Sequence, residues 1–155
     1  MAEKQPSSRS CFVCGRENGA GLRTQWENDR AAGEVRSSVV LAEQFHGYPG
    51  IAHGGVVAAL LDEAMVRSLL LAGGFEDLMV TARMEVAYRR ATPTAAPITI
   101  VGRVVKRSSS RATAQAEIRL ADGTVTAEAE GLLTRPPPDV ATAWAAERPF
   151  WSVDE

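Results

Sequence analysis

One segment near the middle of the chain constrains the fold most: residues 54–72, with the sequence GGVVAALLDEAMVRSLLLA. It is rich in Ala and Leu and is followed by Gly73 and Gly74, so we expect a helix that ends at these glycines. Its apolar residues surround nearly the whole helix, whereas a surface helix carries only an apolar stripe. Other structure must therefore enclose this helix. A chain of 155 residues provides a single domain in which to do so.

Strands are expected on both sides of this helix. Before it, residues 22–27 and 33–40 are β-like runs around a turn at residues 28–30, which predicts a hairpin. The Gly- and Pro-rich residues 45–50 (FHGYPG) then predict a shaped loop. After the helix, side chains alternate over residues 80–88, with Thr81 on the face opposite to Met84.

A meander follows, with strands over residues 98–107, 112–120 and 125–133. Asp122 and Gly123 form the turn between the last two strands. The order of elements predicts an α+β fold in which a long antiparallel sheet wraps around one central helix. This geometry leaves an open sheet edge and an exposed helix flank, which favours pairing with a second copy of the chain.

The two ends differ from this domain, which we expect to span residues 11–135. Residues 1–10 are polar and predict a disordered arm. Residues 136–155 begin with three prolines and predict a C-terminal tail whose aromatic residues pack across a neighbouring element.

Charge and composition exclude several classes of function. Seventeen Lys and Arg residues against nineteen Asp and Glu residues give a net charge of -2, which provides no general attraction to nucleic acid or to an acidic membrane. Charged residues interrupt the longest apolar run, so we expect no membrane span. The N-terminus lacks the apolar core of a secretory signal, and two cysteines are too few for a disulfide scaffold. We therefore expect a cytoplasmic protein.

The start of the helix, His53-Gly54-Gly55, has the features of a site for a carbonyl oxygen or an oxyanion. The first amide N–H groups of a helix lack intrahelical partners and lie at the positive end of its dipole. Glycine also lets a bound molecule approach the backbone closely. A tight turn before the helix would explain the same glycines.

Asp62 is the second candidate, because it lies within the apolar run and has Met65 and Val66 at the positions three and four residues later. Its neighbour Glu63, by contrast, has Arg67 at the spacing of a helix ion pair. An unpaired carboxylate is costly in apolar surroundings. Asp62 is therefore either a general base or the partner of a hydroxyl or arginine from another element.

The two candidates are too far apart to act together within one chain. Gly55 and Asp62 are separated by seven residues, or about 10 Å along a helix. Hydrogen bonds reach about 3 Å. Antiparallel helices across a dimer would combine the amides of one subunit with the carboxylate of the other.

These residues resemble a known family. The segment HGGVVAALLDEAM, preceded by FHGYPGIA and followed by TARMEVAYRRATP, resembles the hotdog-fold acyl-CoA thioesterases of the phenylacetate-pathway (PaaI-like) type, and the resemblance extends over residues 11–134. It implies hydrolysis of acyl-CoA without a metal or redox cofactor, by a homodimer or by a dimer of such dimers.

The resemblance also implies roles for individual residues. Asp62 would be the general base or nucleophile, the Gly55 N–H would polarise the thioester carbonyl, and Thr81 would orient water. His53 would shape the loop and touch the same oxygen. Some members carry an Asn where this chain has Gly47. The residues expected to bind substrate near the helix start are Gly54, His46 and Tyr48.

A coenzyme A site requires positive charge, and the sequence offers two basic groups. Basic side chains and serine hydroxyls suit nucleotide phosphates, although basic residues also commonly cap exposed strand ends. The members of the two groups are Arg89, Arg90, Lys106, Arg107, Ser108 and Arg111.

Cys11 and Cys14 are spaced like half of a zinc site, but four ligands would require the histidines as well, so we expect a buried structural pair and no metal. Trp26, Phe45 and Tyr48 could line an acyl pocket or fill the core.

Two other functions remain open. A hydratase or dehydratase on this fold would need a His and a carboxylate at one β-hydroxyacyl group, whereas His53 and Asp62 are separated along the helix. A non-catalytic acyl-CoA binding protein is the other, since fold alone does not settle function.

Overall fold

The computed structural model describes residues 2–154. Within these residues seven strands and two α-helices are joined by loops and short 3-10 turns. The strands are β1 (Glu3–Lys4), β2 (Glu27–Asp29), β3 (Glu34–Val40), β4 (Val80–Tyr88), β5 (Pro97–Arg107), β6 (Arg111–Leu120) and β7 (Val125–Thr134). The helices are α1 (Gly54–Ser68) and α2 (Pro138–Ala145), and the 3-10 turns are η1 (Glu43–Phe45), η2 (Leu69–Leu71), η3 (Phe75–Asp77) and η4 (Arg148–Phe150).

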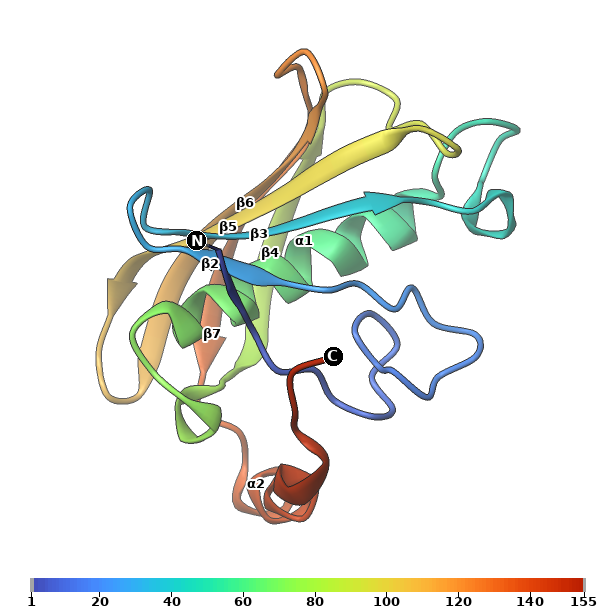
Figure 1. Cartoon of the computed structure of the whole chain (residues 1–155). Coiled ribbons are helices and arrows are strands. Elements are labelled where there is room, and N and C mark those ends of the chain that lie inside the picture. The colour runs from blue at the N-terminus through green and yellow to red at the C-terminus, as the bar shows by residue number, and fades with distance from the viewer. Residues whose placement is uncertain (1, 155) are drawn as a thin grey trace.

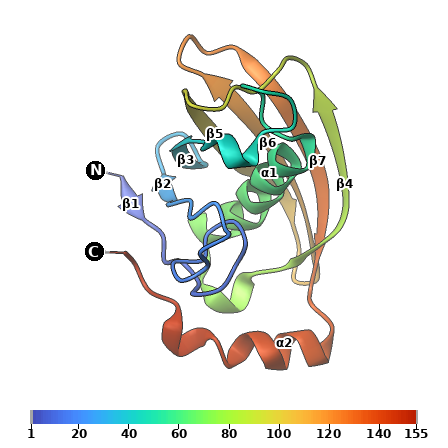
Figure 2. The ribbon, with the colours of Figure 1, turned by 90° about the vertical axis from the view of Figure 1, so that its right-hand side faces the viewer.

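The strands form one antiparallel sheet in the order β1-β2-β3-β5-β6-β7-β4. The sheet curls around α1, as the view in Figure 2 shows most directly. Strands β5, β6 and β7 form the expected meander, with Gly123 at positive φ in its second turn. The predicted α+β hotdog arrangement is therefore confirmed, and β4 is left as an edge of the sheet with α1 beside it (Figure 1).

Small side chains let α1 lie close to the sheet. On the inner faces of β6 and β7, alternate residues are fully buried and mostly alanine: Ala112, Ala114, Ala116, Ala127 and Ala129. On β5, a Cβ atom at Gly102 would lie 2.1 Å from the carbonyl oxygen of Ala64 in α1. The backbones of helix and sheet therefore meet at this point with no room for a side chain.

The central helix matches its prediction over most of its length. It begins at Gly54, and after Ser68 the chain continues as the 3-10 turn η2 before reaching Gly73. The face with Leu60, Leu61 and Met65 is fully buried, but the flank with Asp62 and Val66 is only half-buried. The helix is thus enclosed on the sheet side, and the flank beside β4 is left partly open.

The first hairpin forms, but its turn lies later than the sequence predicted. Asn28 and Asp29 belong to β2 and pair with β3, and residues 30–33 make the turn. Gly33 supplies the positive φ of 67° that this turn requires. Residues 22–26 are not a strand.

A bulge corrects the expected orientation of Thr81. In the pairing of β4 with β7, Thr81 lies opposite Leu133 and Arg83 lies opposite Leu132, so Ala82 is an extra residue. Because a bulge shifts the alternation by one position, Thr81 lies on the same face as Met84 and points toward α1. Simple alternation had placed it on the opposite face.

The polar N-terminal segment is ordered, so the predicted disordered arm is wrong for the described residues 2–10. Gln5, Ser7 and Ser8 are buried, and Lys4 pairs with Glu27 in the sheet. The side-chain amide of Gln5 donates hydrogen bonds to the Asn28 side chain and to the backbone carbonyl of Arg67. Polar residues usually favour disorder, but here they satisfy buried groups of the sheet and helix.

The C-terminal tail packs against its own chain. Its helix α2 crosses below α1 in Figure 2, and the ring of Trp144 stacks on that of Phe75 at 4.7 Å. Arg16 donates to the carbonyls of Phe150 and Ser152, which fastens the tail to the N-terminal segment. Within residues 2–154, no helix is long and apolar enough to cross a membrane.

The contact at Gly102 yields a stability prediction. Alanine at this position should lower the free energy of unfolding by about 3 kcal/mol, because its Cβ would displace the α1 backbone. Urea denaturation would measure the change. Gly74→Ala is the matched control, since nothing lies within 4 Å of its added Cβ. Equal stability of the two variants would contradict the argument.

Candidate active site

Two side-chain hydrogen bonds hold the helix start in place. His53 is the N-cap of α1, and its Nδ1 accepts the N–H of Gly55 at 2.9 Å. Since Nδ1 accepts, the neutral ring carries its proton on Nε2, which is free to donate. At the end of β4, the Tyr88 hydroxyl donates to the Gly54 carbonyl at 2.7 Å. The sequence interpretation had used Tyr88 only as a strand residue.

The loop before the helix packs closely on His53. Gly47 lies against it, and an added Cβ would be 3.3 Å from the His53 Cα. His46 forms an isolated β-bridge with Ala52 and is exposed. Tyr48 is 79% exposed. The loop therefore presents His46 and Tyr48 at the surface near the helix start.

Asp62 receives a hydrogen bond from Thr81, the residue to which the family resemblance assigns a role in the same reaction. The Thr81 hydroxyl donates to Asp62 Oδ1 at 2.5 Å. Among the described residues, this is the one hydrogen bond to the Asp62 carboxylate, and no ion pair reaches it. The other carboxylate oxygen is left to accept from a bound molecule. The predicted hydroxyl partner from another element is therefore confirmed, and the role of Asp62 as a general base stays a prediction.

The site residues form two separate groups in one chain. Asp62 and Thr81 lie in the middle of α1 and near the start of β4, whereas His53, Gly54 and Gly55 lie at the helix start beside Tyr88, the last residue of β4. No hydrogen bond within residues 2–154 joins the two groups. One chain thus provides a carboxylate at one end of β4 and, at the other end, a helix start whose Gly55 N–H donates to His53 Nδ1.

The two basic groups also lie at opposite ends of the sheet. Arg111 and Val80 both pair with Thr134 of β7, so the β5–β6 turn is at the start of β4. Arg89 and Arg90 are at its other end. They do not form one patch within a chain.

Two of these basic side chains form ion pairs with acidic neighbours. Arg89 pairs with Glu128 at 2.6 Å and Arg107 pairs with Asp77. Ser108 accepts the Arg111 N–H within the β5–β6 turn. Lys106, Arg90 and Arg111 are exposed and have no ion pair among the described residues. These three side chains are the ones available to an anionic ligand.

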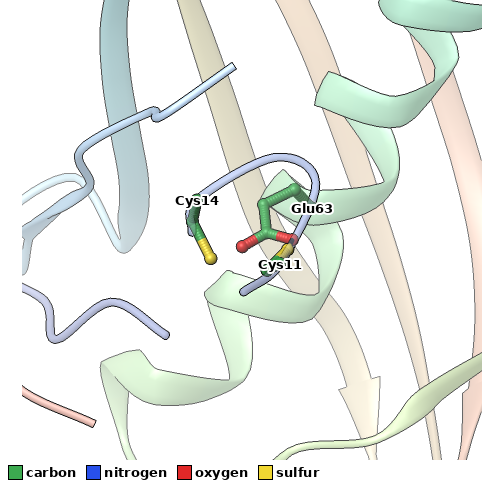
Figure 3. Close-up of side chains that lie close together, drawn as sticks. All are labelled: Cys11, Cys14 and Glu63. Carbon is green, nitrogen blue, oxygen red and sulfur yellow. Dashed lines mark hydrogen bonds between the residues drawn. The ribbon is translucent and has the colours of Figure 1, made fainter. Parts of the chain in front are cut away.

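Cys11 and Cys14 lie beside Glu63, which the sequence analysis had not associated with them. Figure 3 shows both thiols facing Glu63 of α1, and the three potential ligand atoms lie within 4.8 Å of one another. The zinc site considered from the sequence would have used the histidines. However, His46 and His53 precede the first residue of α1, whereas Glu63 lies in the second half of this helix. Arg67 already holds Glu63 Oε1 at 2.8 Å, as its spacing predicted.

Burial and hydrogen bonding shift the acidity of this cluster. A hydrogen bond from Cys14 lowers the pKa of Cys11 to about 7, against the opposing effect of burial. The same bond, together with burial, raises the pKa of Cys14 to about 12. Burial raises the pKa of Glu63 to about 7 despite the nearby charge of Arg67. The cluster therefore changes charge close to neutral pH.

The aromatic residues proposed for an acyl pocket are placed differently. Trp26 is 2% exposed and belongs to the hydrophobic core, where its indole N–H donates to Thr24. Phe45 is half-buried and Tyr48 is exposed. The aromatic residues that do line a cavity, Trp144 and Trp151, come from the C-terminal tail.

Comparison with known proteins agrees with this fold. Residues 49–127 match the family model described as the thioesterase superfamily. The crystal structure of a thioesterase superfamily protein shares 33% identity and a TM-score of 0.74, covering 81% of this chain; the chain spans 60% of that protein's length. No curated protein matches.

Two further structures share the fold at lower identity. The PaaI protein of Escherichia coli, from the phenylacetic acid degradation operon, has 17% identity and a TM-score of 0.60, with 68% of this chain and 74% of that chain covered. A hypothetical thioesterase of Streptococcus pneumoniae, solved with coenzyme A, has 21% identity and a TM-score of 0.59, with 67% and 82% covered. The matched family model includes both the helix start and the Asp62–Thr81 pair, and the chain belongs to the thioesterase superfamily.

Proposed function

We propose that this protein hydrolyses the thioester of acyl-coenzyme A to a free acid and coenzyme A. The observation that carries the proposal is the Asp62 carboxylate, which is half-buried, oriented by Thr81 and free of any ion pair among residues 2–154. Membership in the thioesterase superfamily supports it. Two neighbours of similar fold were solved with coenzyme A or acetyl-CoA.

The proposed reaction uses Asp62 as a general base. Asp62 takes a proton from water, the water oxygen bonds to the thioester carbon, and the carbonyl electrons move to oxygen. Backbone N–H groups at a helix start stabilise such an oxyanion. We assign this role to the Gly55 N–H, which would turn from His53 Nδ1 to the substrate oxygen, and to the His53 Nε2–H. The C–S bond then breaks, and the proton on Asp62 passes to the departing sulfur. No metal or redox cofactor takes part.

A homodimer would bring the two halves of the site together. Strand β4 is a nine-residue edge, and sheet edges of this length readily pair with another chain. Under two-fold symmetry the strands pair antiparallel. The start of β4 then lies beside the end of β4 in the partner subunit. Asp62 and Thr81 would thereby face Gly55 of the partner subunit.

The same arrangement would unite the basic groups. Arg89 and Arg90 of the partner subunit would lie at the end of the sheet that carries Lys106 and Arg111. We propose that the coenzyme A phosphates bind there, since a single chain offers only half of the positive charge. This explains how a protein of net charge -2 could hold a polyanionic substrate.

The first test replaces Asp62 with Asn, which keeps the shape and removes the base. We expect kcat to fall by about a thousandfold, within the range that a general base contributes. Thiol release from a panel of acyl-CoAs would measure this. Two results would count against hydrolysis: a folded variant that retains most activity, or wild-type protein that only hydrates crotonyl-CoA or binds acyl-CoA without turnover.

Thr81 is proposed as a positioning residue, so its hydroxyl should matter more than its size. Thr81→Val is expected to lower kcat by about tenfold, because a hydrogen bond to a charged group is lost. Thr81→Ser keeps the hydroxyl and should retain most of the wild-type kcat. If both variants behave alike, Thr81 acts through packing alone.

Mixed dimers would test the composite site. Gly55→Pro removes the Gly55 N–H, and with it the hydrogen bond to His53 Nδ1, in the first turn of the helix, where proline is tolerated. Asp62→Asn removes the base. Each variant should be inactive alone. After refolding an equal mixture, one site in each heterodimer is intact, which predicts about a quarter of the wild-type activity. A mixture that stays inactive would place both groups in one subunit.

A further inference from the structure

The cluster of Cys11, Cys14 and Glu63 is not used in the proposed reaction. Figure 3 shows the two thiols and the carboxylate facing one another. Their potential ligand atoms all lie within 4.8 Å of one another. Within the described part of the chain, this is the one group of three or more His, Cys, Asp or Glu side chains that meet so closely. The cluster is therefore a candidate metal site.

The turn that carries the two cysteines is shaped to hold a thiolate. The Val13 N–H donates to Cys11 Sγ at 3.3 Å, and the Gly15 N–H donates to the Cys11 carbonyl at 2.8 Å. A Cβ atom at Gly15 would lie 2.3 Å from that carbonyl oxygen, so this tight turn requires glycine. Hydrogen bonds to a charged group favour its charged form. The turn thus presents two cysteines at the C-x-x-C spacing of zinc sites, with a backbone donor in place for one of the sulfur atoms.

The carboxylate of Glu63 is oriented toward the same centre. Arg67 Nε donates to Glu63 Oε1 at 2.8 Å, and Glu63 Oε2 lies 3.9 Å from Cys11 Sγ. A tetrahedral zinc ion, with bonds of about 2.3 Å to sulfur and about 2.1 Å to oxygen, would hold those two atoms about 3.6 Å apart. Small rotations of the side chains would therefore admit the ion. Arg67 would then be the outer partner that fixes the orientation of a metal ligand.

The charges of such a site would balance. Two thiolates, one carboxylate and a zinc ion together carry one net negative charge. Arg67, which is 1% exposed, supplies one positive charge beside Glu63, and its charge also favours the thiolate form of Cys14. Buried charges require such compensation. On binding, the metal would displace the two thiol protons to solvent.

We propose that Cys11, Cys14 and Glu63 bind a zinc ion, with water as the fourth ligand. All three residues line a cavity of about 250 Å³, which leaves room for that water. Thiolates are soft ligands and a carboxylate is a hard one, and zinc accepts both. The sequence predicted no metal here, because four ligands would have required the histidines. The structure offers Glu63 in their place.

The zinc ion would fasten the N-terminal segment to α1. Other contacts already join them, since Arg67 donates to the Pro6 carbonyl and Gln5 donates to the Arg67 carbonyl. A metal bond to Glu63 from the turn at Cys11 would add a link of much greater strength. The proposed role is structural, so zinc should raise stability whether or not the protein hydrolyses a thioester.

Zinc binding would be measured on the whole chain, kept reduced, by competition with a chromogenic chelator. We expect one zinc ion per chain. At a free zinc concentration about a hundredfold above Kd, Tm should rise by about 8 °C. X-ray absorption of the zinc-loaded protein should find two sulfur and two oxygen ligands, and cobalt(II) in the same site should give a thiolate charge-transfer band. Reduced wild-type protein that binds no zinc, or zinc held by oxygen atoms alone, would overturn the proposal.

Two variants test the ligands. Cys11→Ser and Glu63→Gln each remove one ligand and should weaken zinc binding by at least about a hundredfold, because loss of an outer partner alone costs ten- to a hundredfold. Glu17→Gln is the matched control, since its carboxylate is exposed and lies outside the cluster. Wild-type affinity in Glu63→Gln would reject the third ligand, and equal weakening in Glu17→Gln would reject a defined site. If the loss of the Glu63–Arg67 pair prevents folding, X-ray absorption of the wild-type protein still decides the third ligand.

A disulfide between Cys11 and Cys14 is the competing use of the pair. Mass spectrometry of the purified protein would detect it as the loss of two hydrogen atoms. A disulfide that forms in air, together with no uptake of zinc after reduction, would replace the metal site with a redox pair. These measurements need no thioester substrate. Absence of thiol release would therefore reject the proposed hydrolysis and leave the zinc result unchanged.

Discussion

The close contact between α1 and the sheet at Gly102 and Ala64 is the constraint on which the rest of the structure depends. Because helix and strand backbones touch there, the helix has one possible depth in the sheet. Alanines on β6 and β7 extend the same close fit along its length. That depth places Asp62 within reach of the Thr81 hydroxyl on the edge strand. A larger residue at the contact would move the carboxylate away from its partner.

Much of the fold could be predicted because its signals are local. The apolar residues of α1, the alternation along β6 and the turn at Gly123 each depend on a few neighbouring residues. The ordered structure of residues 2–10 could not be predicted in the same way. Gln5 and Ser7 are polar, and their partners lie far away in the sequence, at Asn28 and Ser152.

The candidate site shows the same division. Asp62 and the helix start were identified from residue type and spacing, together with the family resemblance. The side chain of Thr81 reaches Asp62 only because of the bulge at Ala82, which the pairing with β7 determines. Strict alternation would have turned that hydroxyl away. Tyr88 was missed for a similar reason, since its partner Gly54 is 34 residues away.

The fastening of the two chain ends has a consequence for folding during synthesis. Arg16 bonds to carbonyls at Phe150 and Ser152, so the cavity beside α1 is complete only once those residues have left the ribosome. The sheet and helix need only residues made earlier. A nascent chain could therefore assemble the Asp62–Thr81 pair while the wall carrying Trp144 is still missing. The wall of this cavity would be completed last.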